Sequence, residues 1–335
     1  MTPRRASKVN RDGAAALAPG VLAGDRRALA RAITLVESAK PADAAEAEAL
    51  LTALLPHTGR AMRLGISGAP GVGKSTFIEA FGLHLTGQGK RVAVLAVDPS
   101  SRRSGGSILG DKTRMAALAR DPKAFIRPSP AGTTLGGVAR RTREAILTVE
   151  AAGHDVVIVE TVGVGQSETA VADMTDLFVL LVGPGGGDDL QGIKRGVMEL
   201  ADLVLVTKAD GDLAAAAGRA AADYQAALHL MRPKHEGLTT DVLMISALEG
   251  RGVDASWEAM ERLHATVTRS GALERMRAGQ AKRWFWSEIH EALIEAVDRD
   301  PATGDLARAL EAGVAAGRSL PAAAARAFLK AFRGA

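Results

Sequence analysis

The 335-residue sequence contains no cysteine. Such a chain has no disulfide framework, no thiolate metal site and no cysteine nucleophile. The absence also fits the reducing environment of the cytoplasm, where structural disulfides are rare. We therefore expect a cytoplasmic protein.

Aromatic residues are scarce as well, with three Trp, one Tyr and seven Phe. Proteins that bind single strands or RNA loops stack bases on aromatic side chains, and few are present here. The formal net charge of +4 is small for this length. Nucleic-acid-binding proteins concentrate a basic excess on one face, so composition argues against a nucleic-acid partner.

Long hydrophobic runs are missing too. No uncharged apolar stretch reaches the length of about eighteen residues that a membrane span needs, so no membrane segment is predicted. Basic residues precede the first acid at Arg4, Arg5, Lys8 and Arg11. They suit a frayed basic N-terminus, which we favour, or a short transit-like leader, although no apolar signal core follows.

Both ends of the chain have helical patterns. In the alanine-rich first sixty residues, one helical stripe comprises Leu22, Leu29, Ile33 and Val36, and a second comprises Leu50, Leu51, Leu54 and Leu55. After about residue 255 we expect helices at 256–264 and 272–297, then two short alanine-rich helices. Within 272–297 an i, i+4 stripe comprises Phe285, Ile289, Leu293 and Val297. It needs either a packing partner in the monomer or a subunit interface.

Short runs rich in Val, Ile and Leu fill the middle of the chain. They lie at 63–66, 91–97, 155–159, 177–182, 203–206 and 242–245, with a weaker one at 124–126. Such runs suit strands buried on both faces, and the helical stretches between them suit right-handed crossovers in a parallel sheet. Ligands of this architecture bind beyond the carboxyl ends of the strands.

A glycine-rich loop follows the first predicted strand. Residues 68–75 (GAPGVGKS) match the phosphate-loop pattern G-x-x-x-x-G-K-[ST] between a strand and a helix. Its backbone N–H groups are expected to surround phosphates at a helix N-terminus. Lys74 is expected to reach the β- and γ-phosphates, and the Ser75 hydroxyl to bind Mg²⁺. The predicted nucleotide contacts are Gly68, Ala69, Pro70, Gly71, Val72, Gly73, Lys74, Ser75 and Thr76.

Two acids follow predicted strands at the same edge of the sheet. Glu160 ends the fourth strand and precedes Gly163 by three residues. This spacing is typical of a Walker-B/switch element, in which the acid holds metal-bound water and the glycine N–H contacts the γ-phosphate. Most such switches carry aspartate, so a longer or water-mediated metal contact is expected for Glu160. Asp98 is either a second metal-side acid or part of an Asp-Pro turn.

Two further elements have the residue types that recognise guanine. Thr207-Lys208-Ala-Asp210 resembles the N/T-K-x-D element of GTPases. The Asp210 carboxylate can accept both guanine N1–H and N2–H, whereas adenine presents an acceptor at N1 and is repelled. Lys208 is expected to lie along the base. Thr207 replaces the commoner asparagine, so the amide that usually ties this loop to the base and the phosphate loop is absent.

The second base-reading element is an S-A-x-x-G loop after the last strand. Its predicted nucleotide contacts are Ser246, Ala247 and Leu248, where backbone N–H groups meet guanine O6. Phosphate loop, switch glycine and both base-reading elements occur in the order expected of a GTPase. We therefore predict GTP and GDP as ligands, with Mg²⁺ as the metal.

Four longer blocks resemble the MeaB/ArgK family of P-loop GTPases. They are 97–101 (VDPSS), 105–115 (GGSILGDKTRM), 160–168 (ETVGVGQSE) and 183–194 (GPGGGDDLQGIK). The resemblance implies an α/β P-loop NTPase fold with a SIMIBI-like G domain, a mostly parallel sheet, flanking helices and helical extensions at both ends.

This resemblance also implies the organisation and role of the protein. It implies a homodimer with an N-terminal helical extension at 1–55, a GTPase domain at 56–255 and a C-terminal helical dimerisation arm at 256–335. The implied partner is adenosylcobalamin-dependent methylmalonyl-CoA mutase. Slow intrinsic GTP hydrolysis, stimulated by the mutase, would gate cofactor loading and protect or reactivate the mutase.

Residue roles are carried over position by position. Asp111, in the first switch, is implied to orient or activate the attacking water, although it also suits a helix N-cap. Gln166 resembles a water-positioning glutamine. The candidate catalytic residues are Lys74, Asp111, Glu160 and Gln166, and the implied metal ligands are Ser75, Asp98 and Glu160. A third switch that couples nucleotide state to the mutase is implied at Asp188, Gln191 and Lys194.

Three other functions are compatible with parts of the sequence. A kinase would share the phosphate loop, but no acceptor pocket is evident in the sequence. A nickel-chaperone GTPase would use Cys and clustered His, whereas this chain has no Cys and seven scattered His. A nucleotide-dependent interaction protein with negligible turnover is the third alternative, and a GTPase assay with and without the mutase separates it.

Overall fold

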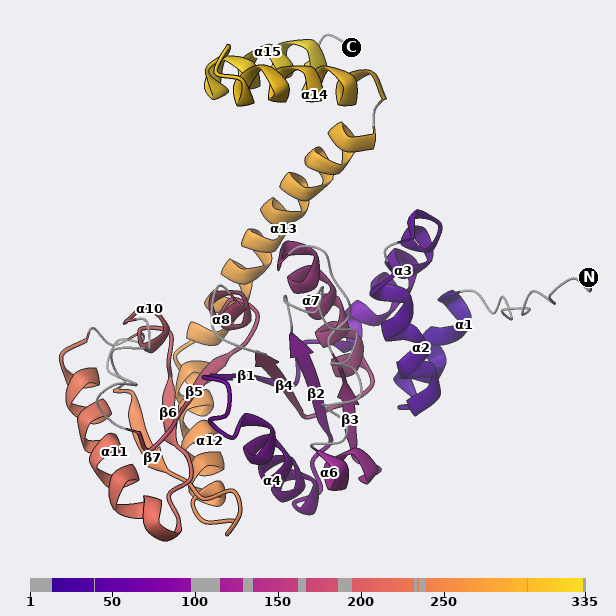
Figure 1. The fold of residues 1–335 in the computed structure, drawn as a ribbon. Helices are drawn as coiled ribbons and strands as arrows, with labels where there is room; N and C mark the ends of the chain where they lie inside the picture. Colours follow the sequence, from indigo (N-terminus) through magenta and orange to yellow (C-terminus); the bar gives the residue numbers. More distant parts are fainter. Residues whose placement is uncertain are drawn as a thin grey trace, which may run out of the picture. The chain divides into compact units, whose positions relative to one another are not determined.

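Seven strands of the described residues form one parallel sheet in the computed structural model of the chain (Figure 1). The structure describes residues 14–38, 40–97, 115–128, 135–161, 167–185, 195–231, 234, 239–299 and 301–333. The strands are β1 (Met62–Gly68), β2 (Val92–Val97), β3 (Ala124–Arg127), β4 (Val156–Thr161), β5 (Leu177–Val182), β6 (Leu203–Val206) and β7 (Asp241–Met244). Their spatial order is β3-β2-β4-β1-β5-β6-β7, which confirms the predicted α/β fold with a parallel sheet.

The strands form where the sequence is apolar on both faces. Every residue of β2, β4 and β5 is buried, because helices cover the sheet on both sides. Only β7, at one edge, has exposed ends at Asp241 and Met244. The weak run at 124–126 is also a strand, so all seven predicted runs are confirmed to within two or three residues.

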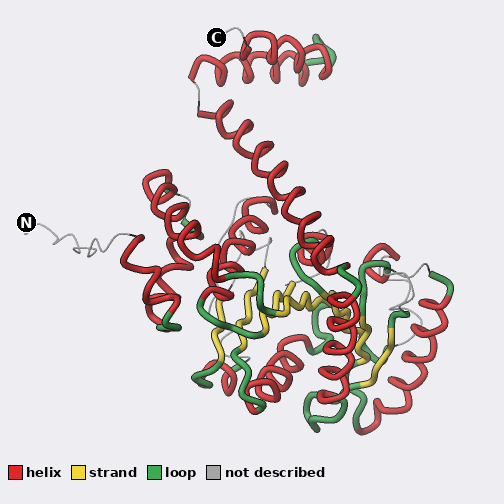
Figure 2. The backbone as a smooth tube through the Cα atoms, turned by 180° about the vertical axis from the view of Figure 1, so that it is seen from behind, coloured by secondary structure: helices red, strands yellow, loops and turns green. Residues whose placement is uncertain are grey.

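Two helical layers enclose the sheet (Figure 2). On one face α4 (Lys74–Gly87), α6 (Ala116–Arg120) and α12 (Val253–Arg269) contribute to an apolar core with Leu64, Ile66 and other inward strand residues. On the other face α8 (Ser167–Ala172) approaches so closely that a Cβ at Gly65 would lie 2.8 Å from Val171. Next to α8, α7 (Leu135–Ala151) packs against β2 and β4.

Shorter elements complete this part of the chain. α11 (Ala214–His229) packs beside β6 and β7, and η1 (Leu55–His57) precedes β1. The remaining short helices are α10 (Arg195–Met198) and η2 (Gly211–Leu213). Because neighbouring strands are parallel, the carboxyl ends of β4, β1, β5 and β6 lie at one edge of the sheet.

The N-terminal helices differ from the predicted stripe. Residues 22–36 do not form one helix, because α1 (Ala14–Leu22) ends before Gly24, which has a φ of +73°. Asp25 then caps α2 (Arg26–Val36) by accepting a 2.7 Å hydrogen bond from Ala28 N. Leu22 is therefore 39% exposed. α3 (Pro41–Leu54) follows, and all three helices contact α7.

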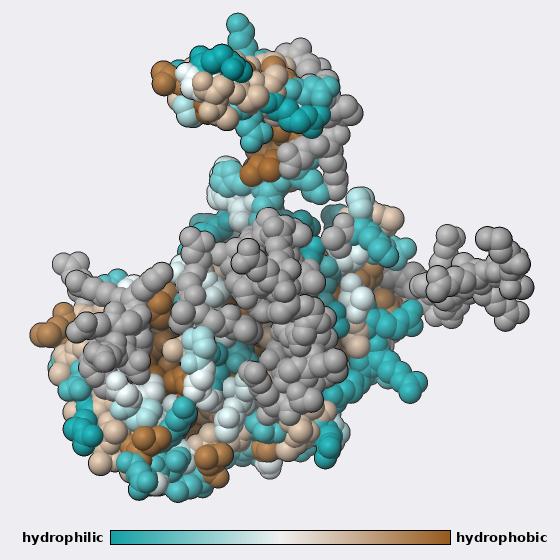
Figure 3. All heavy atoms as spheres, viewed as in Figure 1, coloured by the Kyte–Doolittle hydropathy of each residue, from teal (hydrophilic) through white to brown (hydrophobic). Residues whose placement is uncertain are grey.

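The C-terminal helices are close to those predicted. They are α13 (Ala272–Arg299), α14 (Pro301–Ala315) and α15 (Pro321–Arg333). Proline at the first position of α14 and α15 suits a helix start, where no N–H is needed. Contacts divide the chain into two units, Met1–Arg277 and Ala278–Ala335. The face in Figure 3 shows hydrophobic residues beside hydrophilic ones on the C-terminal unit. Within the described ranges, no helix has both the length and the apolar character that crossing a membrane requires.

Candidate nucleotide site

The phosphate loop lies between the end of β1 and the start of α4. A Cβ at Gly68 would lie 2.4 Å from the Leu181 carbonyl oxygen, so only glycine fits beside β5. Gly73 has a φ of +102° and caps α4 in a conformation that other residues rarely adopt. Nothing lies within 4 Å of a Cβ built at Gly71 or Gly73. This open, glycine-lined side of a helix N-terminus suits phosphate groups.

Lys74 is held inside the loop. Its Nζ donates hydrogen bonds to the carbonyl oxygens of Gly68, at 2.7 Å, and Ala69, at 3.2 Å. The residue is only 9% exposed. Burial lowers the pKa of Lys74 below its ordinary value, while the nearby carboxylates of Glu160 and Glu168 oppose that shift. The ammonium group therefore lies against the backbone of the phosphate loop and is poorly solvated.

Two of the three predicted metal-side residues, Ser75 and Glu160, lie close together. Glu160 is the fifth residue of β4 and is 4% exposed. Its Oε1 lies 3.5 Å from Ser75 Oγ in the first turn of α4. Ser67, in β1, and Thr161 join the same strand ends through a 2.8 Å hydrogen bond between their hydroxyls. Among the residues that the structure describes, no three His, Asp or Glu gather in a cluster that could hold a metal ion.

The base-reading loop after β6 contacts the phosphate loop directly. Thr207 Oγ1 donates to the Val72 carbonyl oxygen at 2.7 Å, or to that of Val182 at 3.1 Å. Lys208 Nζ donates to Gly71 O at 2.9 Å, and its backbone has a φ of +56°. Thr207 therefore ties this loop to the phosphate loop through its hydroxyl, although it lacks the asparagine amide that usually does so.

Asp210 faces the second base-reading loop. Its Oδ2 accepts a short hydrogen bond from Ser246 Oγ, and the Ser246 backbone N donates to Arg251 O at 2.9 Å. The same Ser246 hydroxyl accepts from Glu249 N at 3.2 Å. Leu248, at the tip of this loop, is 81% exposed. Residues more than thirty positions apart in sequence therefore meet at one end of the sheet.

Pro70, Thr76 and Ala247 lie in the described phosphate loop, α4 and second base-reading loop, whereas seven other predicted site residues lie outside the described ranges. They are Asp98, Asp111, Gly163, Gln166, Asp188, Gln191 and Lys194.

One carboxylate near Lys74 was not among the predicted site residues. Glu168 lies in the first turn of α8, is 2% exposed and acts electrostatically on Lys74. Its Oε2 lies 3.5 Å from Ser167 Oγ. The sequence offered one indication of this role, because Glu168 is the last residue of the family-like block 160–168 and follows Gln166 by two positions.

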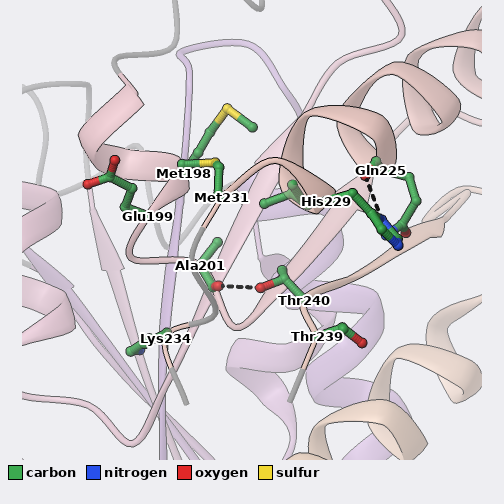
Figure 4. Close-up of a pocket in the computed structure, with 10 residues that line it drawn as sticks. Met198, Glu199, Ala201, Gln225, His229, Met231, Lys234, Thr239 and Thr240 are labelled. Atoms are coloured by element: carbon green, nitrogen blue, oxygen red, sulfur yellow. Dashed lines mark hydrogen bonds between the residues drawn. The ribbon is translucent and has the colours of Figure 1, made fainter. Parts of the chain in front are cut away.

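A separate pocket lies at the opposite, amino-terminal ends of β6 and β7 (Figure 4). Two polar side chains of this pocket are hydrogen-bonded to backbone carbonyls. Thr240 Oγ1 donates to Ala201 O at 3.1 Å, and Lys234 Nζ donates to Leu200 O at 3.2 Å. Lys234 also pairs with Asp202 at 2.6 Å. None of the predicted nucleotide residues lines this pocket.

Comparisons with known proteins identify the family of the chain. A model of the family described as methylmalonyl Co-A mutase-associated GTPase MeaB matches residues 29–302. The GTPase ArgK of Escherichia coli (strain K12) is 52% identical over 271 residues, which cover 81% of this chain and 82% of that protein. The methylmalonic aciduria type A homolog, mitochondrial, of Mus musculus is 49% identical over 324 residues, which cover 94% of this chain and 78% of that protein.

A solved structure is similar over nearly the whole chain. The crystal structure of an LAO/AO transport system kinase has a TM-score of 0.76 and 39% identity, and the match covers 96% of this chain and 97% of that one. The family match spans most of the sequence, including the phosphate loop and both base-reading loops. The chain therefore belongs to the methylmalonyl-CoA mutase-associated GTPase MeaB family and is a P-loop GTPase that binds GTP and GDP.

Proposed function

We propose that the protein is a GTP-driven chaperone of adenosylcobalamin-dependent methylmalonyl-CoA mutase, acting in the cytoplasm. GTP binding and hydrolysis would gate cofactor loading and protect or reactivate the mutase. The family match over residues 29–302, whose description names a mutase-associated GTPase, carries this proposal. The name of the Mus musculus relative, which refers to methylmalonic aciduria, supports it.

Within the site, the phosphate loop holds the GTP phosphates. The open sides of Gly71 and Gly73 face them, and Lys74 leaves the Gly68 and Ala69 carbonyls to bind the β- and γ-phosphates. Removing a lysine from two carbonyl acceptors costs little when phosphate oxygens replace them, because charge-assisted bonds are stronger. Lys74 is then the group of the described site that faces the charge developing on the transferred phosphoryl group.

Magnesium fits the donors present. The Ser75 hydroxyl and the Glu160 carboxylate are hard oxygen ligands at 3.5 Å from each other, and Mg²⁺ prefers such ligands together with water and phosphate oxygens. Bound there, Mg²⁺ would neutralise charge on the phosphates. Asp98 is proposed as a further metal-side acid, and Asp111 and Gln166 as the residues that orient the attacking water. Gly163 is proposed to contact the γ-phosphate.

The base lies between the two base-reading loops. Asp210 accepts from guanine N1–H and N2–H, the Lys208 stem lies along the ring, and backbone N–H groups at Ser246, Ala247 and Leu248 meet O6. The Ser246 hydroxyl, which donates to Asp210, supports the proposal by orienting its carboxylate. Asp188, Gln191 and Lys194 are proposed to signal the nucleotide state to the mutase.

A homodimer through the C-terminal arm completes the proposal. The apolar side chains of Phe285, Trp286, Leu293 and Ile294 on α13 are between 53% and 63% exposed. Large exposed apolar side chains that gather on one helix are typical of a protein interface.

The partnership is tested by measuring phosphate release from GTP with and without purified methylmalonyl-CoA mutase. We expect turnover to rise when the mutase is added, and the two proteins to co-purify differently with GDP and with a non-hydrolysable GTP analogue. The Lys74→Ala variant controls for contaminating GTPases and should show no stimulated turnover.

The results separate the alternatives. Unchanged turnover together with nucleotide-independent indifference to the mutase would contradict the chaperone proposal while leaving the GTPase intact. Phosphate transferred to protein rather than released to water would favour a kinase, which is the activity in the name of the similar LAO/AO transport system kinase.

A further inference from the structure

The Thr207 hydroxyl is committed to the protein's own backbone. Thr207 is 4% exposed, and its Oγ1 lies 2.7 Å from Val72 O in the phosphate loop and 3.1 Å from Val182 O at the end of β5. Both neighbours are carbonyl oxygens, which only accept hydrogen bonds. A threonine hydroxyl carries a single proton, so the two carbonyls share it and none remains for a ligand.

The same loop is also held on both sides by backbone hydrogen bonds. Thr207 N donates to Val182 O at 2.9 Å, and Ala209 N donates to Ile245 O at 3.0 Å. Lys208 Nζ reaches Gly71 O, next to the Val72 carbonyl that Thr207 holds. Two successive residues of the base-reading loop are therefore bonded to two successive residues of the phosphate loop.

Guanine needs donors that Thr207 lacks. Its N7 and O6 are acceptors, so a hydrogen bond to N7 requires a proton from the protein or from water. An asparagine amide has two N–H donors and a carbonyl, and could serve the phosphate loop and N7 together. Threonine can serve only one of them, and here it serves the phosphate loop.

We infer that Thr207 is a positioning residue for the phosphate loop, and that the protein recognises guanine without a side-chain hydrogen bond to N7. Specificity then comes from the Watson–Crick edge, through Asp210 and the loop at 246–248. This inference rests on the proposed placement of guanine at Asp210. It predicts a purine site that tolerates changes at N7.

Affinity for 7-deaza-GTP, in which a C–H group replaces N7, tests the specificity. We expect the wild-type dissociation constants for GTP and 7-deaza-GTP to agree within about threefold. A tenfold or larger preference for GTP, equivalent to the loss of a full hydrogen bond of about 1.4 kcal/mol, would overturn the inference. The Thr207→Asn variant should acquire a preference for GTP over 7-deaza-GTP if its amide reaches N7.

Thr207→Val tests the positioning role. Valine keeps the shape of threonine but leaves the buried Val72 carbonyl without its donor, so GTP and 7-deaza-GTP should both bind at least fivefold more weakly, with their ratio unchanged. Thr207→Ser keeps the hydroxyl and should restore most of the affinity, which a loss of packing alone would not predict. Wild-type affinity in Thr207→Val would disprove the positioning role.

The Asp210→Asn variant distinguishes failure of this inference from failure of the proposed guanine site. An asparagine at 210 can donate to the O2 of xanthine, so its preference should shift from GTP towards xanthosine triphosphate. If Asp210→Asn keeps the wild-type preference for GTP, the base does not lie at Asp210, and the proposed site fails whatever the 7-deaza-GTP ratio is.

Discussion

The imidazole of His154 is buried beside the sheet and makes stability depend on pH. It follows α7, is 6% exposed, and its Nδ1 lies 2.9 Å from Val149 O. Burial, with the nearby charge of Arg91, lowers the pKa of His154 from 6.5 to about 4. The unfolded chain therefore binds a proton near pH 6.5, whereas the folded chain binds it only near pH 4.

Because the folded pKa is depressed, the contribution of His154 to stability is complete above pH 6.5 and falls as the pH drops towards 4. The expected loss across this window is roughly 3 kcal/mol. His154→Leu should flatten this part of the curve, as measured by urea unfolding at several pH values. His57→Gln, at an exposed position, is the control and should keep the wild-type slope. An unchanged slope in His154→Leu would contradict the assignment.

Residue identities predicted which described residues gather at the candidate site better than they predicted the contacts between them. The G-x-x-x-x-G-K-S pattern predicts a glycine-rich turn that opens a helix, and the structure has this turn between β1 and α4. The bond from Thr207 to Val72 joins residues 135 positions apart. No spacing rule predicts a single side-chain hydrogen bond over that separation, since it depends on the final register of β1, β5 and β6.

At the scale of elements, the start of α13 is tied to the sheet by a buried ion pair. Arg277 donates from Nε to Asp176 Oδ1 at 2.8 Å and from Nη2 to Asp176 Oδ2 at 2.6 Å. It also donates to Gly59 O at 2.6 Å and Ala61 O at 2.8 Å. Burial alone would raise the pKa of Asp176, but His264 and the Arg277 guanidinium hold it below its ordinary value.

Removing Arg277 should therefore destabilise the first unit strongly. The Asp176 side chain has no exposed surface, so Arg277→Ala leaves a buried carboxylate without its main partner, at a cost of about 3 kcal/mol or more. The midpoint of urea unfolding reports the loss. Arg275→Ala, which changes an exposed arginine two residues earlier, is the matched control and should cost little. Equal midpoints for the two variants would show that the ion pair is not structural.

Element types were predictable because the strands are buried on both faces and are therefore continuously apolar. The boundaries of the N-terminal helices were harder to predict. The spacing of Leu22, Leu29 and Ile33 suits one helix, but Gly24 and the capping Asp25 interrupt it. Hydrophobic periodicity does not reveal a short break that keeps the apolar residues on one face. Capping residues such as Asp25 show where one helix ends and the next begins.

At the scale of the whole molecule, the sequence alone did not determine which surface covers the apolar stripe of α13, formed by Phe285, Ile289, Leu293 and Val297. The alternatives were packing within the monomer and a subunit interface. Phe285 is 60% and Leu293 53% exposed, so neither is buried by the rest of the described chain. Exposed side chains of this size would also favour aggregation if nothing covered them, and a second copy removes both from water.

We therefore predict that the double variant Phe285→Glu/Leu293→Glu is monomeric under conditions in which the wild type is a dimer, as measured by analytical ultracentrifugation. Two carboxylates in an apolar interface are costly to desolvate, whereas on an exposed helix they cost little. Glu291→Lys is the control, because residue 291 lies about 240° around the helix from residue 285 and about 160° from residue 293. GTP turnover without the mutase should match the wild type, since the predicted nucleotide residues all lie in Met1–Arg277. A monomeric wild type, or a double variant that remains dimeric, would show that α13 does not form the interface.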